Sequence, residues 1–418
     1  MPRSLILSVK SPLLSLVIFI LGHGLLTTLL TIRLSMEHVS AQWIGFISTA
    51  YFAGLILGSF INIPLILRIG HIRAYAAYAS LLATLCLLHG LFVDPMIWSG
   101  LRLLGGIATG GLFVVIESWM LVSSSRKNRG NLMAIYMVLL YGALATGQLL
   151  LKYVDPTLLT PFAMSAMAAS VSVIPLSLTR VGNPKIESPQ RISFFSLIKL
   201  TPAGMGCCFI SGLVLGALYG LLPLFFSMNG FHLNEVANLM AIVILGGVCL
   251  QYPIGRYSDG HDRRFILQML AIFLTIASIG ILLMPENRPE WLMGSLIFLF
   301  GGLAFSIYPV SVSHACDELT PNQVVSANQS LMLSYSIGAM VGPLIAPSLI
   351  QLTPQNGLFI YFVGCGIMMA GFLLWRRKVR TPVPLSEHQS YTSVPPNTLV
   401  GAELDPRKHT EPTSPNKP

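Results

Sequence analysis

Residues 255–264 read GRYSDGHDRR, a short polar and basic segment between two long apolar stretches. Residues 63–73 read IPLILRIGHIR and stand in the same setting in the first half of the chain. Each segment combines the end of an apolar stretch with Gly, His and Arg. Recurrence of one connection in both halves is typical of membrane proteins that arose by internal duplication. The two segments therefore predict a chain made of two related halves.

The composition indicates that most of the protein surface contacts lipid. Of the 418 residues, 54% are hydrophobic and 10% are charged. A soluble domain carries about a quarter of charged residues. The net charge of +9 is spread over short connections and the tail, which argues against nucleic acid as a partner. The six cysteines lack metal-ligand or redox spacing, and we interpret them as core residues.

Apolar stretches of the length needed to cross a bilayer, about 20 residues, occur twelve times between polar breaks. They predict an all-α integral membrane protein. The predicted helices are 12–34, 42–67, 75–93, 96–122, 131–151, 161–178, 203–228, 233–254, 265–284, 291–316, 324–350 and 357–375.

The positive charges alternate from one connection to the next. Eighteen Lys and Arg residues fall on the side of the N-terminus and three fall on the other side. Short connections rich in Lys and Arg stay in the cytoplasm. We therefore expect both termini to be cytoplasmic, and one missed helix would destroy this alternation.

Polar segments divide the chain into four parts. We expect an N-terminal six-helix bundle over residues 1–179 and a basic cytoplasmic linker over residues 180–200. A second six-helix bundle follows over residues 201–378. Residues 379–418 are rich in Pro, Ser, Thr and Asn and predict a disordered cytoplasmic tail.

The connection at 255–264 resembles the signature of the major facilitator superfamily. That signature is a Gly, small or apolar residues, Asp, Arg, Gly and a basic pair. Gly255, Asp259, Arg263 and Arg264 occupy the Gly, acidic and basic positions. Asp262 stands where the second Gly is expected.

The connection at 63–73 is a degraded copy of the same signature. Arg68, Gly70 and Arg73 match it. Ile63 replaces the leading Gly and Leu67 replaces the acid. The resemblance implies two six-helix bundles related by pseudo-symmetry.

In the superfamily this connection acts as a gating latch, in which the acid pairs with arginines at neighbouring helix ends. By resemblance, Asp259 with Arg263 or Arg264 would have that role here. Without the resemblance these residues would be ordinary cytoplasmic anchors, and both interpretations remain open. In the first connection the latch is in doubt, because Leu67 can carry no charge.

The fourth predicted helix carries Arg102, and a guanidinium within hydrocarbon must face a cavity or a partner. Gly106 and Gly110 lie on nearly the same helical face and allow a close helix contact. The superfamily also has an Arg followed by Gly on this helix, which is often discussed in proton transfer. The alternatives are a packing salt bridge or a contact with lipid headgroups. Glu117, further along the helix, would lie about 60° around the helix axis from Arg102, so both could line one surface.

Several segments narrow the resemblance to one branch. The runs VVIESWM, RKNRGNLMAIYM, YGALATGQLL, ALYGLLPL and SANQSLMLSYSIGAMVGP are similar to the bacterial YcaD-type permeases. The likeness extends over most of the chain before the tail. It supports the fold and implies no substrate.

Polar side chains near helix centres are candidates for a solute or proton pathway. His23 lies near the middle of the first predicted helix, and an imidazole titrates in the pH range of the proton gradient. It could equally be a neutral core histidine. Aromatic hydroxyls suit an amphipathic solute or interhelical hydrogen bonds. Four tyrosines lie near the centres of other helices: Tyr141, Tyr219, Tyr308 and Tyr335.

We therefore expect a secondary transporter of a small solute that works by alternating access and is driven by protons. The alternative is a receptor or scaffold on the same fold. No phosphate-binding loop or metal-ligand motif is present, so we expect no enzymatic activity and no cofactor. The expected partners are a small-molecule substrate, the lipid bilayer and protons, with no nucleic acid. The expected form is a monomer in the bacterial inner membrane.

Overall fold

The computed structural model describes residues 3–123, 129–178, 194–285, 289–319, 323–379, 383–384 and 388–392. Most of the predicted linker (180–193) and the end of the predicted tail (393–418) lie outside these residues. Within the described residues, twelve helices are long and apolar enough to cross a membrane and no strand occurs. This confirms the predicted all-α membrane fold.

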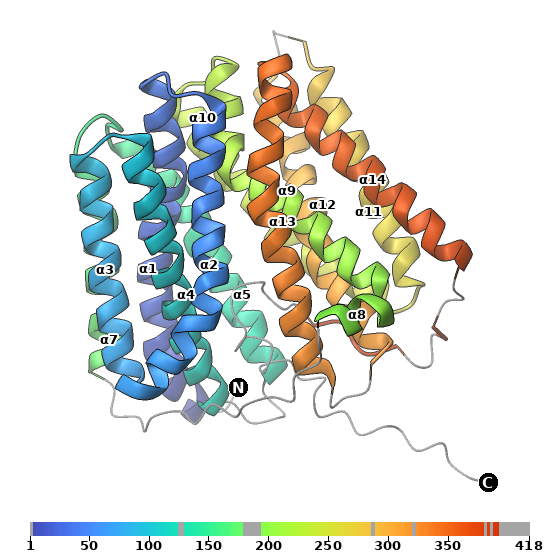
Figure 1. Ribbon diagram of the computed structural model, residues 1–418, viewed down its shortest axis with the longest axis horizontal. Helices are drawn as coiled ribbons and strands as arrows, with labels where there is room; N and C mark the ends of the chain where they lie inside the picture. Colours follow the sequence, from blue (N-terminus) through green and yellow to red (C-terminus); the bar gives the residue numbers. More distant parts are fainter. Residues whose placement is uncertain are drawn as a thin grey trace.

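The first half of the chain forms one bundle of membrane-spanning helices (Figure 1). Its last span consists of two helices, α6 and α7, which meet at Ser172. In chain order the elements are α1 (Arg3–Met36), α2 (Ala41–Ile69), α3 (His71–Leu91), α4 (Pro95–Ser123), α5 (Arg129–Leu149), the 3-10 helix η2 (Leu150–Tyr153), α6 (Thr160–Val171) and α7 (Val173–Ser177).

The second half forms a matching bundle. A short helix within the predicted linker, α8 (Phe194–Leu200), leads into it. The capping carboxylate of Asp262 accepts a 3.0 Å hydrogen bond from the Arg264 amide and fixes the start of α11. The spans are α9 (Pro202–Met228), α10 (Leu233–Ser258), α11 (Arg263–Leu282), α12 (Glu290–Asp317), α13 (Val324–Leu352) and α14 (Gly357–Val379).

Glycines allow the same helix pairs to approach closely in both bundles. In the first bundle, Gly54 of α2 lies against Gly106 of α4. In the second bundle, Gly246 of α10 and Gly301 of α12 each face the backbone of the other helix. Small residues permit such backbone contacts between membrane helices. The second and fourth spans of each half therefore pack in the same way, as expected for a duplicated architecture.

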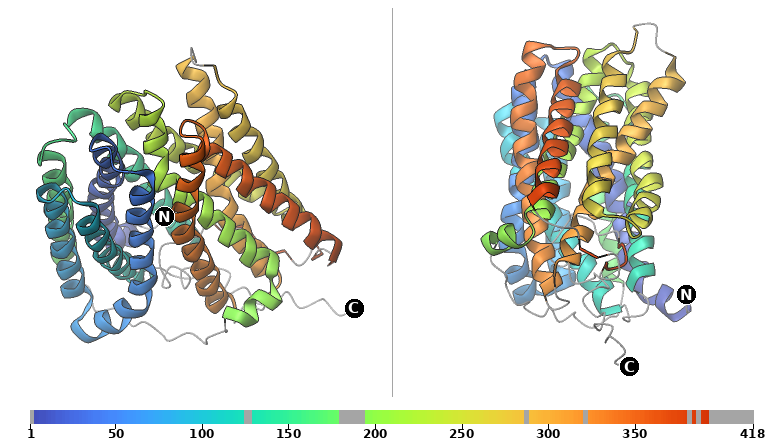
Figure 2. Two further views of the ribbon diagram at one scale, coloured as in Figure 1. Left: turned by 45° about the horizontal axis from the view of Figure 1, so that its top comes forward. Right: turned by 90° about the vertical axis from the view of Figure 1, so that its right-hand side faces the viewer.

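The molecule has two distinct ends. We call the end that carries the N-terminus and the connections at Arg68 and Arg256 the basic end, and the opposite end the far end. Figures 1 and 2 show the two bundles side by side, with α2 next to α13 and a wider separation of the ribbons toward the basic end. The helix pairs α1–α9, α2–α13 and α5–α10 join the bundles.

Candidate transport site

A cavity of about 1290 Å³, its open mouth included, lies between the two bundles. Both bundles contribute to its wall, chiefly through α1, α2, α4 and α5 on one side and α9, α12 and α13 on the other. Ligand sites occur preferentially where two structural units meet. The geometry therefore places a candidate solute site at the interface of the two bundles.

Three hydrogen bonds between described residues join the bundles in the far half of the molecule. The Thr31 hydroxyl donates to the Gly220 carbonyl at 3.0 Å, and the Ser35 and Ser227 hydroxyls lie 3.2 Å apart. The Thr49 hydroxyl donates to the Met340 carbonyl at 2.8 Å. We call this set the far-end seal. It holds the bundles together on the side of the cavity away from the termini.

The first bundle supplies the polar and charged part of the wall. Arg102 is 8% exposed and lines the cavity. Its guanidinium carbon lies 4.1 Å from the centre of the Tyr51 ring, a cation–π contact. The Tyr51 hydroxyl lies 3.3 Å from Nε2 of His23. One cluster therefore connects α1, α2 and α4 at membrane depth.

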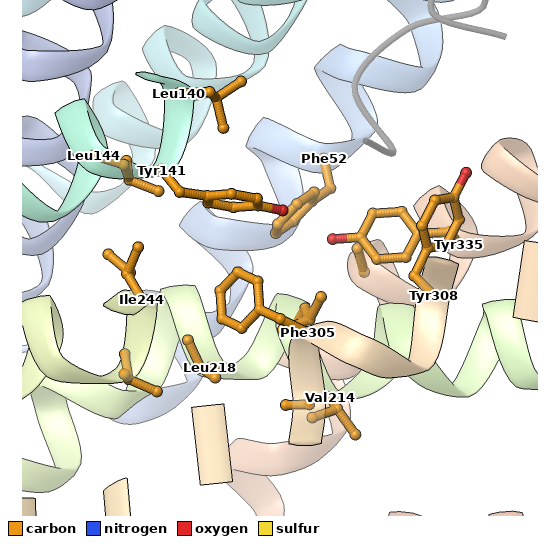
Figure 3. Packing of buried hydrophobic residues seen from close by; sticks show 14 of the residues in the cluster. Phe52, Leu140, Tyr141, Leu144, Val214, Leu218, Ile244, Phe305, Tyr308 and Tyr335 are labelled. Atoms are coloured by element: carbon orange, nitrogen blue, oxygen red, sulfur yellow. The ribbon is translucent and has the colours of Figure 1, made fainter. Parts of the chain in front are cut away.

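Both bundles supply the aromatic part of the wall. Phe305 of α12 lies at the centre of this group, with ring centroids 5.4 Å from Tyr141 and 5.9 Å from Tyr219. Tyr308 and Tyr335 pack edge to face with centroids 5.1 Å apart. Figure 3 shows Tyr141 and Tyr308 pointing toward one another from the two bundles.

Six of the seven predicted pathway residues lie in the cavity wall: His23, Arg102, Tyr141, Tyr219, Tyr308 and Tyr335. Their part in transport stays a prediction. Glu117 is fully buried in the first bundle and accepts a 2.9 Å hydrogen bond from the Tyr136 hydroxyl. It is absent from the described cavity wall, so the structure does not bring it together with Arg102.

Four aromatic wall residues were not among the predicted candidates: Tyr51, Phe52, Phe113 and Phe305. Tyr51 carried the same signal as the four predicted tyrosines, since it lies near the middle of an apolar helix. The three phenylalanines had no signal, because Phe is equally common on a lipid-facing surface. Periodicity alone does not distinguish the two faces.

The second basic connection forms a buried ion-pair cluster at the basic end. Arg263 donates to Asp259 at 2.9 Å and lies 3.2 Å from Asp317 at the end of α12. The Arg263 and Asp317 side chains are 0% and 1% exposed. Arg264 pairs instead with Asp262 at 3.3 Å. We call Asp259, Arg263 and Asp317 the ion-pair cluster; Gly255 lies one helical turn before Asp259.

The first basic connection has no such cluster. Arg68 and Arg73 are exposed and form no ion pair with a described residue. Gly70 separates α2 from α3 by a single residue, with φ of 89° and ψ of 153°. L-residues with a side chain rarely adopt this conformation. The predicted gating residues are therefore arranged differently in the two halves.

Residues 388–392 belong to the predicted tail and contact the ion-pair cluster. The Tyr391 amide donates to Asp259 Oδ1 at 2.8 Å, and the Gln389 amide donates to Asp317 Oδ1 at 2.9 Å. Arg263 also donates to the Gln389 carbonyl. Tyr391 is 7% exposed, and its ring lies against Gly255. The carboxylates of Asp259 and Asp317 thus bind the backbone of the tail. Such binding does not require a pattern of apolar side chains in the tail.

Comparison with known proteins agrees with this architecture. Residues 13–333 match the family model of the Major Facilitator Superfamily. The chain is 32% identical to an uncharacterized MFS-type transporter, YcaD, of Escherichia coli O17:K52:H18 over 89% of this chain and 96% of that protein.

Two solved structures share the fold. The nucleoside transporter NupG superimposes with a TM-score of 0.73 at 17% identity, covering 90% of this chain and 100% of that chain. A bacterial homologue of the human lysosomal transporter Spinster, in an inward-facing and unoccupied conformation, gives 0.71 at 12% identity, covering 93% and 99%. The chain therefore belongs to the major facilitator superfamily, as a multi-pass transporter of the bacterial inner membrane.

Proposed function

We propose that the protein is a secondary transporter that moves a small solute by alternating access, with its basic end in the cytoplasm. The observation that carries this proposal is the cavity between two bundles whose hydrogen-bonded contacts lie on its far side. Short basic connections remain cytoplasmic, which supports the orientation. The structure then corresponds to the inward-facing state, and transport requires the far-end seal to open.

Proton coupling is the second part of the proposal. His23 contacts Tyr51 at 3.3 Å beside the buried Arg102, so its protonation would change the charge of the cavity wall. Glu117 is a buried carboxyl bonded to Tyr136, a second group that can exchange a proton. If binding of the solute and binding of the proton both shift the equilibrium between the two access states, transport of one is coupled to transport of the other.

The far-end seal provides a direct test of alternating access. Ser35 and Ser227 would both become cysteine, in a Cys249→Ser background that removes an exposed native thiol. Vesicles loaded with a pH-sensitive dye and exposed to a metabolite library would report solute-driven proton movement. Oxidation should abolish the response, because the bundles can no longer separate, and a reductant should restore it.

A matched control pair joins the same end within one bundle. The Asn229 side chain donates to the Gln355 carbonyl, and both residues belong to the second half. Cysteines at these two positions should leave flux intact after oxidation. Undiminished flux through the cross-linked Ser35–Ser227 pair would refute alternating access.

Other outcomes separate the parts of the proposal. Library compounds that bind without flux would favour a receptor. Uptake of a radiolabelled solute without a change in the dye signal would retain transport and reject proton coupling. If His23→Ala and Glu117→Gln both left uphill transport and its pH dependence unchanged, the proposed proton route would be wrong.

A further inference from the structure

Arg102 is an unneutralised charge in the cavity wall. No carboxylate among the described residues lies within ion-pair distance of it, and none lines the cavity. The described lining has one other basic side chain, His23. A guanidinium at membrane depth is costly unless a partner or polar surroundings compensate its charge. The Tyr51 ring offsets part of this cost and leaves the net positive charge in place.

The wall opposite this charge is apolar and aromatic. Phe305, Tyr308 and Tyr335 from the second bundle line the same cavity as Arg102. Edge-to-face packing fixes Tyr308 against Tyr335 and Phe305 against Tyr141. Such rings bind planar or aromatic groups by stacking and by hydroxyl contacts. A ligand that spans the cavity would meet a cation at one side and aromatic rings at the other.

We infer that the transported solute is a small organic monoanion, a carboxylate with a planar or aromatic body. Its carboxylate binds Arg102, and its body lies against Phe305 and Tyr308. The guanidinium fork matches a carboxylate with two parallel hydrogen bonds. This inference rests on the proposed transport function and names the substrate class of the same cavity.

Matched probes test the charge preference by binding alone. Purified protein would be titrated with indole-3-acetate, with the neutral indole-3-acetamide and with the cationic tryptamine, and thermal stabilisation would be measured. We expect the acetate to bind at least about tenfold more tightly than the amide, because the charged acid forms stronger hydrogen bonds with the guanidinium than the neutral amide does. The same experiment with 3-phenylpropionate and its amide separates the indole ring from the charge.

Substitutions assign the preference to Arg102. Arg102→Gln should remove the discrimination between acid and amide, and Arg102→Lys should retain part of it. If Arg102→Gln does not fold, Phe305→Ala gives a second measurement, because it should weaken acid and amide alike. Preference for tryptamine, or equal binding of acid and amide to the unmodified protein, would overturn the inference. Selective acid binding without flux would leave the inference intact and reject the transport function.

A different observation carries a second inference, about the tail. Residues 389 and 391 bind the ion-pair cluster through backbone amides, and the Gln389 side chain donates to the Cys316 carbonyl at 3.2 Å. The segment therefore joins the α10–α11 connection to the end of α12. It covers the face on which the superfamily resemblance places the gating contacts of Asp259.

We propose that residues 388–392 form an intramolecular clamp that favours the state open at the basic end. When the basic end closes, Asp259 must pair with groups that approach it from neighbouring helix ends. Tyr391 occupies Asp259 Oδ1 in the present state. The clamp thus competes with closure, and its release should favour opening of the far end.

Substitution by proline removes the two amide donors while keeping the full chain. A single cysteine at Ser35, in the Cys249→Ser background, would report opening of the far end by its labelling rate with an impermeant maleimide. Gln389→Pro with Tyr391→Pro should raise that rate at least about fivefold, since two charge-assisted hydrogen bonds are lost. Ser390→Ala, on an exposed residue of the same segment, should leave it unchanged. An unchanged or lower rate in the double variant would overturn the clamp.

Discussion

The two basic connections occupy equivalent places in the two bundles but differ in structure. In the second bundle, α10 ends at Ser258, and Asp259 at its C-terminus points into a buried ion-pair cluster. In the first, α2 continues through Leu67 to Ile69, so the position of the lost acid lies within the helix and is exposed. The two connections thus differ both in where the helix ends and in whether the basic end has buried ion pairs.

The cavity divides its chemistry along the same boundary. The first bundle provides both basic side chains of the described wall, Arg102 and His23, whereas both bundles provide aromatic rings. A duplicated architecture has therefore diverged twice, at the gate and at the binding wall. Duplication preserves the packing of helices, whereas each half can change its side chains independently.

The largest difference between the halves should follow removal of a basic side chain. Arg263→Ala leaves Asp317, which is 1% exposed, as a buried charge without its arginine. Breaking a buried pair in this way costs about 3–5 kcal/mol. Arg73→Ala, on the exposed side of the first connection, should change the free energy of unfolding by less than about 0.5 kcal/mol. Denaturant unfolding in detergent measures both, and equal losses would contradict the comparison.

Substitution of glycine should have a smaller effect on stability, and here the greater loss should occur in the first connection. Gly70→Ala forces an alanine into φ of 89° and ψ of 153°, which costs about 1–3 kcal/mol. Gly260 in the second connection has no positive φ, and no atom would lie near an added Cβ. Gly260→Ala should therefore be neutral or slightly stabilising. Thermal unfolding midpoints of the two variants distinguish these cases, and a greater loss at Gly260 would refute the assignment.

The smallest effect should come from returning the missing acid. Leu67→Asp places a carboxylate on an exposed helical position, where a new ion pair contributes about 0–1 kcal/mol. We expect the unfolding free energy to stay within that range of the Leu67→Asn control. If Leu67→Asp stabilised the protein as much as the Arg263 ion pairs do, an acid at this sequence position would be sufficient to form such a cluster.

Much of the fold could be predicted from the sequence, because hydropathy summed over about 20 residues reports a span regardless of its details. All twelve spans were predicted, although α2 and α10 extend beyond their predicted ends at 67 and 254. The break between α6 and α7 was not predicted. It involves one residue, Ser172, which barely changes the hydropathy of the segment.

The site was less accessible to prediction for a physical reason. In a helix beside an apolar cavity, the side that faces lipid and the side that faces the cavity carry similar residues. Only polar or ionisable side chains can therefore be recognised from the sequence. This explains why Arg102 and His23 could be proposed and why Phe305 could not. The docking of Gln389 and Tyr391 uses backbone amides, which every residue except proline possesses. No composition rule could have predicted it.

The far-end seal has a consequence for the medium in which the protein works. Its three contacts are neutral hydroxyl hydrogen bonds, each contributing about 0.5–1.5 kcal/mol. Neutral contacts are insensitive to ionic strength, whereas exposed ion pairs weaken as salt rises. With the far end outside, as we propose, the opening of the outer gate would be the same in dilute fresh water and in a concentrated host fluid. With the basic end in the cytoplasm, as we propose, the ion-pair cluster would face a medium whose salt concentration the cell controls.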